Sequence, residues 1–172
     1  MMIKALLASA LTLTTCLGAN ASWVNQHGVT IYDITDVPVS HQPLFRALKA
    51  ANVPVINGKD WKQCVPGEHT YLGGFYVPTR NFIVLCPQAP NGNILQTLVH
   101  EAVHAVQDCR AGQANTAMIH KGTQLMVNLL PDEEVALINE LYPADQHWDE
   151  VEARFLDIYP NYVADQLKTY CL

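Results

Sequence analysis

Residues 93–112 read NILQTLVHEAVHAVQDCRAG, and this stretch decides the fold. Its apolar residues recur at intervals of three and four, which is the period of one helical face. Asn93 can cap the start with Gln96 three positions later in a capping box, and Gly112 can end the helix. The pattern therefore predicts a largely buried helix over residues 94–110.

Inside this predicted helix, residues 100–104 have the pattern H-E-x-x-H. His100 and His104 are four positions apart, so both imidazoles lie on one helical face and can reach a single ion at Zn–N distances of roughly 2.0–2.1 Å. Glu101 is one position away from that face. It is placed to act as the general base that activates a water held by the metal. The motif predicts one Zn²⁺ per chain.

The alternative to a metal site is a buried pair of neutral histidines. Each ring would then need hydrogen-bond partners, and a buried Glu101 carboxylate beside them would carry a further desolvation cost. A metal ion resolves both requirements, so the context of the motif favours the metal site.

A catalytic zinc site takes three protein ligands, so a third ligand must lie outside the motif. The extended pattern H-E-x-x-H-x-x-G-x-x-H is excluded, because Gln107 and Arg110 stand where it requires Gly and His. We favour Glu152, which lies next to the inward face of a predicted helix beside the small Ala153. The other candidates are His120, His147, Asp149 and Glu150.

The HEAVH helix, followed some fifty residues later by the helical sequence Glu-x-Glu-Ala at 150–153, resembles the gluzincin group of zincin metallopeptidases. The resemblance implies ligands His100, His104 and Glu152 with Glu101 as base. Residues 76–85 resemble the edge strand that borders the cleft in minimal zincins, which implies that an extended peptide pairs with it. An equally good interpretation makes the hairpin over residues 71–86 core sheet pinned by a disulfide.

The first residues predict export. Lys4 precedes an apolar run over residues 5–17, and small residues end at Ala21, as in a signal peptide cleaved after that position. A lipoprotein acylated on Cys16 is the alternative, but Thr15 precedes it where such signals carry Gly, Ala or Ser. We expect a secreted or periplasmic protein.

Removal of the signal leaves four cysteines, an even number that an oxidising compartment would pair. No closely spaced pair suggests a structural zinc site. Three connectivities are possible, and we favour Cys64 with Cys86 and Cys109 with Cys171.

Residues 22–172 have the size of one domain. We expect an α+β fold, with a small, mostly antiparallel sheet on the HEAVH helix and a helical C-terminal half. The formal net charge of −6, with no Lys/Arg run, argues against a nucleic-acid partner, and no segment has the length of a membrane span.

The sequence thus predicts an exported zinc metallopeptidase whose partner is a peptide or protein substrate. Two other functions remain open. One is a catalytically silent binding module on the same scaffold, against which an intact Glu101 argues. The other is an amidase acting on cell-wall amide bonds, which would use the same chemistry in a different pocket.

Overall fold

The computed structural model describes residues 23–24, 30–65, 72–87, 93–114 and 123–172. The predicted signal peptide, residues 1–21, and the candidate ligand His120 lie outside these ranges. None of the helices in the described ranges combines the length and apolar character that a bilayer span requires.

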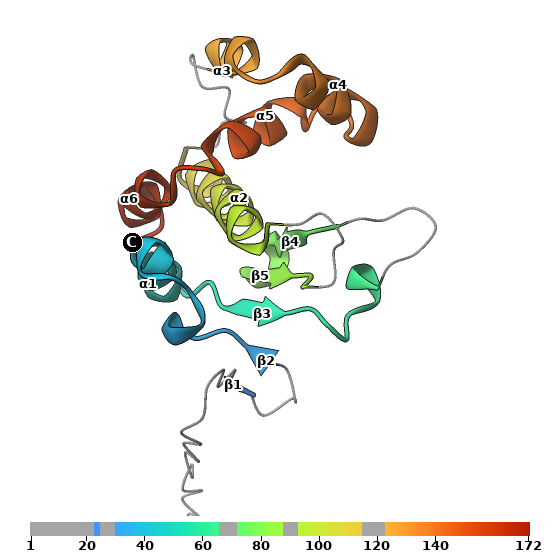
Figure 1. Cartoon of the computed structure of the whole chain (residues 1–172). Coiled ribbons are helices and arrows are strands. Elements are labelled where there is room, and N and C mark those ends of the chain that lie inside the picture. The colour runs from blue at the N-terminus through green and yellow to red at the C-terminus, as the bar shows by residue number, and fades with distance from the viewer. Residues whose placement is uncertain (1–22, 25–29, 66–71, 88–92, 115–122) are drawn as a thin grey trace, which may run out of the picture.

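Strands dominate the first half of the described chain and helices the second (Figure 1). The strands are β1 (Trp23–Val24), β2 (Thr30–Ile31), β3 (Val55–Asn57), β4 (Gly74–Val77) and β5 (Phe82–Leu85). The helices are α1 (Gln42–Ala50), α2 (Ile94–Ala114), α3 (Thr123–Leu129), α4 (Asp132–Leu141), α5 (His147–Leu156) and α6 (Pro160–Tyr170). This is the predicted α+β architecture with a helical C-terminal half.

The strands form one sheet in the order β1-β2-β3-β5-β4. The β3–β5 pair is parallel and the other three pairs are antiparallel, so the prediction of a small, mostly antiparallel sheet is confirmed. β4 is an edge strand. Its backbone groups on the side away from β5 therefore face α2 and the space beside it.

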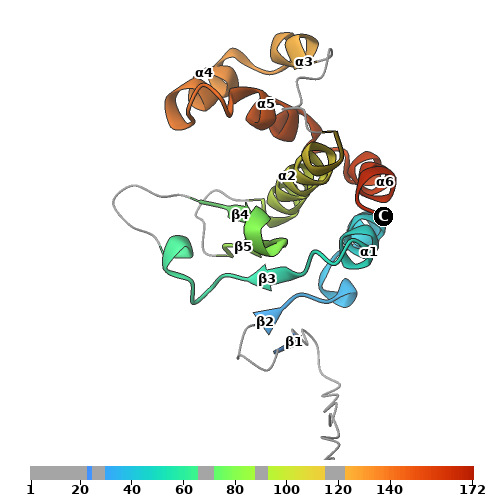
Figure 2. The same ribbon diagram turned by 180° about the vertical axis from the view of Figure 1, so that it is seen from behind.

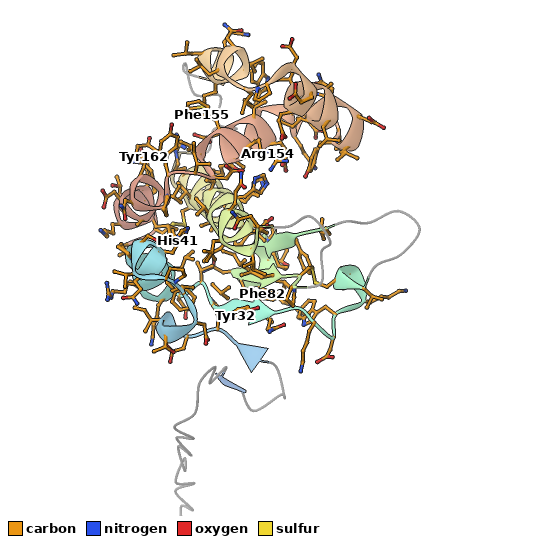
Figure 3. The ribbon with its side chains drawn as sticks, viewed as in Figure 1. Tyr32, His41, Phe82, Arg154, Phe155 and Tyr162 are labelled. Carbon is orange, nitrogen blue, oxygen red and sulfur yellow. A yellow bond between two sulfur atoms is a disulfide. The ribbon has the colours of Figure 1, made fainter. Side chains whose placement is uncertain are left out.

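Helix α2 lies across the sheet, with α5 on its other side and α6 packed along one flank (Figures 1 and 2). α6 packs in turn on α1. Side chains fill the space between these elements (Figure 3). α2 is buried because its apolar residues occupy most of its circumference. Those in the core are Leu98, Val99, Ala102, Val103, Ala105 and Val106.

The β4–β5 hairpin forms as predicted, and its turn is a short 3-10 helix, Pro78–Arg80. β5 is buried along its whole length. β4 can approach α2 closely because Gly74 has no side chain: a Cβ there would lie 2.7 Å from the Val84 carbonyl oxygen and 2.8 Å from Cγ2 of Thr97.

The start of α2 differs in one respect from the predicted capping box. The Asn93 side chain caps the helix, accepting from the N–H groups of Leu95 and Gln96 at 3.2 and 3.3 Å. The Gln96 side chain donates instead to Asp157 at 3.0 Å, so the reciprocal bond of a capping box is replaced by a tertiary one. At the other end, Gly112 does not stop the helix, which continues to Ala114.

Both disulfides pair as predicted, Cys64 with Cys86 and Cys109 with Cys171. The first lies beside the hairpin and the second joins α2 to the residue after α6. Each connects elements that are also in apolar contact.

Candidate metal centre

Helix α2 presents the two predicted histidine ligands side by side. The Nε2 atoms of His100 and His104 lie 3.3 Å apart, and the rings meet edge to face with centroids 4.9 Å apart. This follows from the helix alone, because residues four apart stack one turn above each other.

The third group beside them is Glu150 of α5. One of its carboxylate oxygens lies 3.4 Å from Nε2 of His100 and the other 3.4 Å from Nε2 of His104. Ligands on a tetrahedral Zn²⁺ at roughly 2.05 Å stand about 3.3–3.4 Å from one another. The spacing of these three donor groups, and their N/N/O chemistry, therefore fit zinc, and among the described residues no fourth His, Cys, Asp or Glu joins them.

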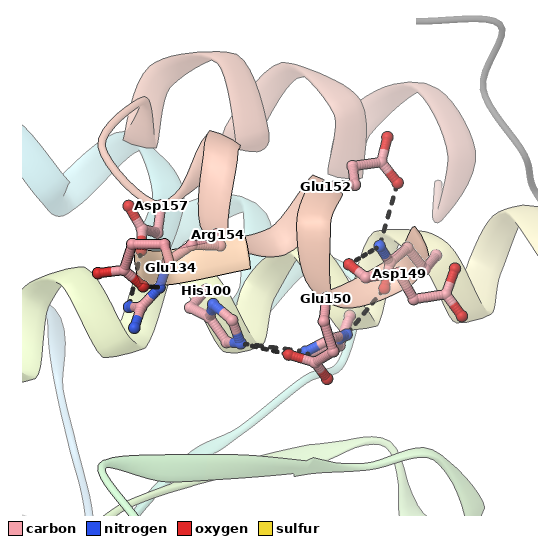
Figure 4. A network of polar contacts seen from close by, with 9 residues as sticks. His100, Glu134, Asp149, Glu150, Glu152, Arg154 and Asp157 are labelled. Carbon is pink, nitrogen blue, oxygen red and sulfur yellow. Dashed lines mark hydrogen bonds and ion pairs between the residues drawn. The ribbon is translucent and has the colours of Figure 1, made fainter. Parts of the chain in front are cut away.

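Glu152, the predicted third ligand, is not one of these three converging donors. Its buried carboxylate accepts hydrogen bonds from Gln107 at 3.0 Å and Arg110 at 3.2 Å, away from the histidine pair (Figure 4). The reason is the rotation of α5 about its axis. Ala153, fully buried, marks the side nearest the core, and Glu150 is about 60° from it around the helix whereas Glu152 is about 100° away on the other side.

Gln107 fixes the chemistry of His104. Its amide nitrogen donates to two groups that can only accept, the Asp149 carbonyl at 2.9 Å and the Glu152 carboxylate. Its oxygen therefore faces Nδ1 of His104, at 2.8 Å, and that ring nitrogen must donate. In the neutral ring Nε2 then carries the lone pair, the state that a metal ligand needs.

His100 and Glu150 influence each other's protonation. Burial lowers the pKa of His100, but the hydrogen bond to Glu150 and the charges of Glu101 and Glu150 outweigh it and raise the pKa overall. Burial raises the pKa of Glu150, but the hydrogen bond to His100 and the charges of both histidines outweigh it, so that pKa is lowered. Each of the two groups therefore favours the charged form of the other.

A second polar network lies behind His100, on the side away from Glu150 (Figure 4). Arg154 binds Glu134 at 2.8 Å and Asp157 at 3.5 Å. Burial raises the pKa of Asp157 despite its hydrogen bond from Gln96. Nδ1 of His100 is buried and has no hydrogen-bond partner among the described residues, unlike Nδ1 of His104.

Glu101 is buried between α2 and the edge strand. Its carboxylate accepts from the backbone N–H of Tyr76, on the outer side of β4. Burial raises the pKa of Glu101, against the lowering effect of the two histidines. A raised pKa brings this carboxylate nearer to neutrality, which suits a group that takes and returns a proton.

A cleft of about 470 Å³ opens in front of these groups. Tyr142, in the connection between α4 and α5, stands on its wall. Its hydroxyl is hydrogen-bonded to Glu150; burial, together with the charges of Glu150 and Glu101, raises its pKa to about 12. His147, an earlier candidate ligand, holds the Tyr142 carbonyl at 2.7 Å and is not one of the converging donors.

Asp149, another candidate, lines the same cleft without joining the three donors. Burial raises its pKa, although His104 nearby lowers it. Asp108, one turn beyond His104, also lines the cleft and accepts from the Tyr76 hydroxyl at 2.9 Å. Besides the motif and Glu150, the cleft therefore carries two further carboxylates, and its described lining contains no Lys or Arg.

Sequence reasoning missed the roles of Gln107, Arg110 and Tyr142. Gln107 and Arg110 follow His104 at intervals of three, so the three side chains share one face of a helix already predicted to be buried, and that spacing was the available signal. Tyr142 carried no such signal, because its place in the cleft depends on how the α4–α5 connection packs.

Residues 88–172 match the model of a family described as a domain of unknown function, DUF8637. The matched segment contains α2 to α6, and with them the two histidines, Glu101 and Glu150. No curated protein and no solved structure matches the chain.

Proposed function

We propose that the protein is a zinc-dependent hydrolase of peptide bonds that works outside the cytoplasm and resembles the gluzincins. The observation that carries the proposal is the convergence of His100, His104 and Glu150 at zinc-ligand spacing, with Glu101 beside them at the head of a cleft. A bound zinc ion would polarise the substrate carbonyl and lower the pKa of a coordinated water to about 7.

The residues of the chain supply the rest of the chemistry. Glu101 takes a proton from the attacking water and returns it to the leaving amine. Its carboxylate is held by the Tyr76 N–H, so it is oriented before substrate arrives. Gln107 keeps His104 in the tautomer that leaves Nε2 free.

An extended substrate would lie along β4. This strand is at the sheet edge, and Gly74, Phe75 and Tyr76 line the cleft. Its outer backbone groups other than the Tyr76 N–H, which Glu101 occupies, can pair with a peptide by β-augmentation. Asp108 and Asp149 add two carboxylates that are not among the three metal donors, and the described lining has no cationic side chain. The cleft therefore suits substrates with basic residues near the scissile bond.

Two features support a site of action outside the cytoplasm. The protein has two disulfides, and these persist in oxidising compartments. The N-terminal sequence has the features of a signal peptide.

The test compares the zinc-loaded wild type with Glu101→Gln on a mixed peptide library, with release of new amino termini as the readout. Glu140→Gln, an exposed change on α4, is the matched control. We expect cleavage by wild type and control, and a loss of at least a hundredfold in Glu101→Gln with zinc content unchanged.

If the zinc-loaded wild type leaves the library uncut, the peptidase proposal fails. Cleavage of cross-linked cell-wall peptides in the same assay, without cleavage of the library, would identify the amidase. Zinc binding with neither activity would favour the binding module.

A further inference from the structure

Two adjacent residues of α2 are attached to two adjacent residues at the end of the chain. Cys109 is disulfide-bonded to Cys171, and their Cα atoms lie 5.3 Å apart, within the range of roughly 4.4–6.8 Å that is usual for such bonds. The guanidinium of Arg110 lies 5.0 Å from the ring centroid of Tyr170, a cation–π distance. The C-terminus is therefore fixed to α2 at one point by a covalent and a noncovalent contact.

From this point a continuous series of hydrogen bonds leads to the metal centre. Arg110 donates to Glu152 at 3.2 Å, Gln107 donates to Glu152 at 3.0 Å, and Gln107 faces Nδ1 of His104 at 2.8 Å. Arg110, Glu152 and Gln107 are all buried, with 5, 4 and 8 % of their surface exposed. Each member has its geometry set by its neighbours, because little water reaches them.

We propose that Tyr170 and Cys171 are positioning residues for the metal ligand His104, acting through Arg110, Glu152 and Gln107. The inference rests on the proposed zinc site, and neither Tyr170 nor Cys171 lines the cleft, whereas Gln107 does. An ion pair inside a protein is favourable only when its geometry is well fixed. The C-terminal contacts fix Arg110, and so keep the Glu152 carboxylate turned toward Gln107.

The other disulfide provides a matched control. Cys64 and Cys86 lie in an apolar cluster with Ile56, Phe82 and Val84, whereas the alternate β5 residues Ile83 and Leu85 pack in the cluster that contains α2. Side chains alternate across a strand, so this disulfide is on the face of the sheet opposite the metal centre. Its removal should lower stability without reaching His104.

The experiment measures zinc affinity by competition with a chromophoric chelator, at a temperature where circular dichroism shows every variant folded. We expect affinity about tenfold lower in Cys109→Ser/Cys171→Ser, at the low end of the 10–100-fold effects of residues behind a metal ligand. Cys64→Ser/Cys86→Ser should unfold at a lower temperature and keep wild-type affinity.

A second pair of variants tests the same idea without touching a disulfide. Tyr170→Phe retains the aromatic ring over Arg110 and should keep wild-type affinity, whereas Tyr170→Leu should weaken it severalfold. A ¹⁵N spectrum of the metal-free protein gives an independent readout: the Nδ1–H tautomer of His104 should be lost in Tyr170→Leu and kept in Tyr170→Phe.

Equal zinc affinity in wild type, Tyr170→Leu and the Cys109/Cys171 variant would overturn the inference and leave the zinc site standing. Equal weakening by removal of either disulfide would also overturn it, since that would be a general effect of lower stability. A wild type that binds no zinc would overturn the proposed function itself, and the inference with it.

Discussion

The side-chain oxygen of Gln107 lies 2.8 Å from Nδ1 of His104, and the amide that carries it is fixed by two acceptors on α5. The helix that supplies Glu150 therefore also orients His104. Because one helix performs both tasks, a change in the packing of α5 on α2 would disturb His104 and Glu150 together.

Glu150 and Glu152 should respond differently to the same substitution. Glu150→Gln removes the carboxylate between the histidines, and we expect the protein to lose stoichiometric zinc on dialysis. Glu152→Gln should retain zinc with affinity lower by about tenfold, while unfolding becomes easier by about 3 kcal/mol because Arg110 loses its buried charge partner. Elemental analysis and denaturant titration measure the two effects. Zinc lost only in Glu152→Gln would reverse the assignment of the third ligand.

The metal-free protein should lose stability as the pH rises above 6.5. His100, with a raised pKa, contributes stability that is complete below its ordinary value of 6.5 and is lost as the pH rises through the pKa of the folded state. The pKa of Glu101 is also raised, so Glu101 contributes stability below pH 4.5, its ordinary pKa, and this contribution is lost as the pH rises further. The pKa of Glu150 is lowered, so Glu150 contributes stability above pH 4.5 and loses this contribution only on acidification.

The stabilisation that zinc gives should increase with pH, because zinc binds neutral histidines. We expect the melting temperature in chelator to fall, and the increase on adding zinc to grow, as the pH rises above 6.5. Thermal melts with and without zinc provide the measurement. Glu150→Gln, which lacks the carboxylate partner of His100, should show a weaker dependence; a metal-free wild type that gains stability above pH 6.5 would contradict the pKa assignments.

Asp108→Asn should reduce the preference for basic substrates. The substitution keeps an oxygen for the Tyr76 hydroxyl and removes one negative charge from the cleft. An exposed charge pair contributes about 1 kcal/mol, so we expect kcat/KM for peptides with Lys or Arg near the cleavage point to fall about fivefold. Neutral peptides should be unaffected, and Asp132→Asn on the exposed start of α4 is the control. An equal loss for both peptide classes would refute the electrostatic explanation.

Asn81 should be important for stability. It has a left-handed backbone, φ 51°, and its side chain donates to the carbonyls of Ala51 and Asn52 at 3.3 and 3.2 Å. Its side-chain oxygen lies 3.0 Å from the Tyr76 hydroxyl, whose single hydrogen it shares with Asp108. Asn81→Ala loses these bonds and strains the backbone, which should cost about 3 kcal/mol.

Asn81→Gly isolates the two effects, because glycine accepts the backbone conformation and lacks the hydrogen bonds. The stability lost in Asn81→Gly should be about half of that lost in Asn81→Ala. Chemical denaturation of both variants, with the exposed Asn139→Ala on α4 as control, gives the comparison. Equal losses in the alanine and glycine variants would show that backbone strain contributes nothing.

The comparison of sequence with structure has a consistent pattern. The β4–β5 hairpin, α2, the helical second half and both disulfides followed from local patterns and from the flanking of elements by cysteines. The end of α2 did not follow from a local pattern, because the helix continues through Gly112 to Ala114. Apart from Gly112, its two chain neighbours and the adjacent helix backbone, no atom of the described residues lies within 4 Å of the place that a Cβ of Gly112 would take. Likewise, the Gln96 side chain donates to Asp157, a residue far away in sequence, and does not form the reciprocal bond of the local capping box.

The sequence by itself determined the pair His100 and His104 and the neighbouring Glu101, because residues four apart in a helix share a face whatever surrounds them. Only the tertiary structure places Glu150, and not Glu152, beside this pair. Both lie on α5 two positions apart, and the rotation of that helix on α2 sends one to the histidines and the other to Arg110. That rotation results from packing between segments distant in the chain, which local periodicity does not encode.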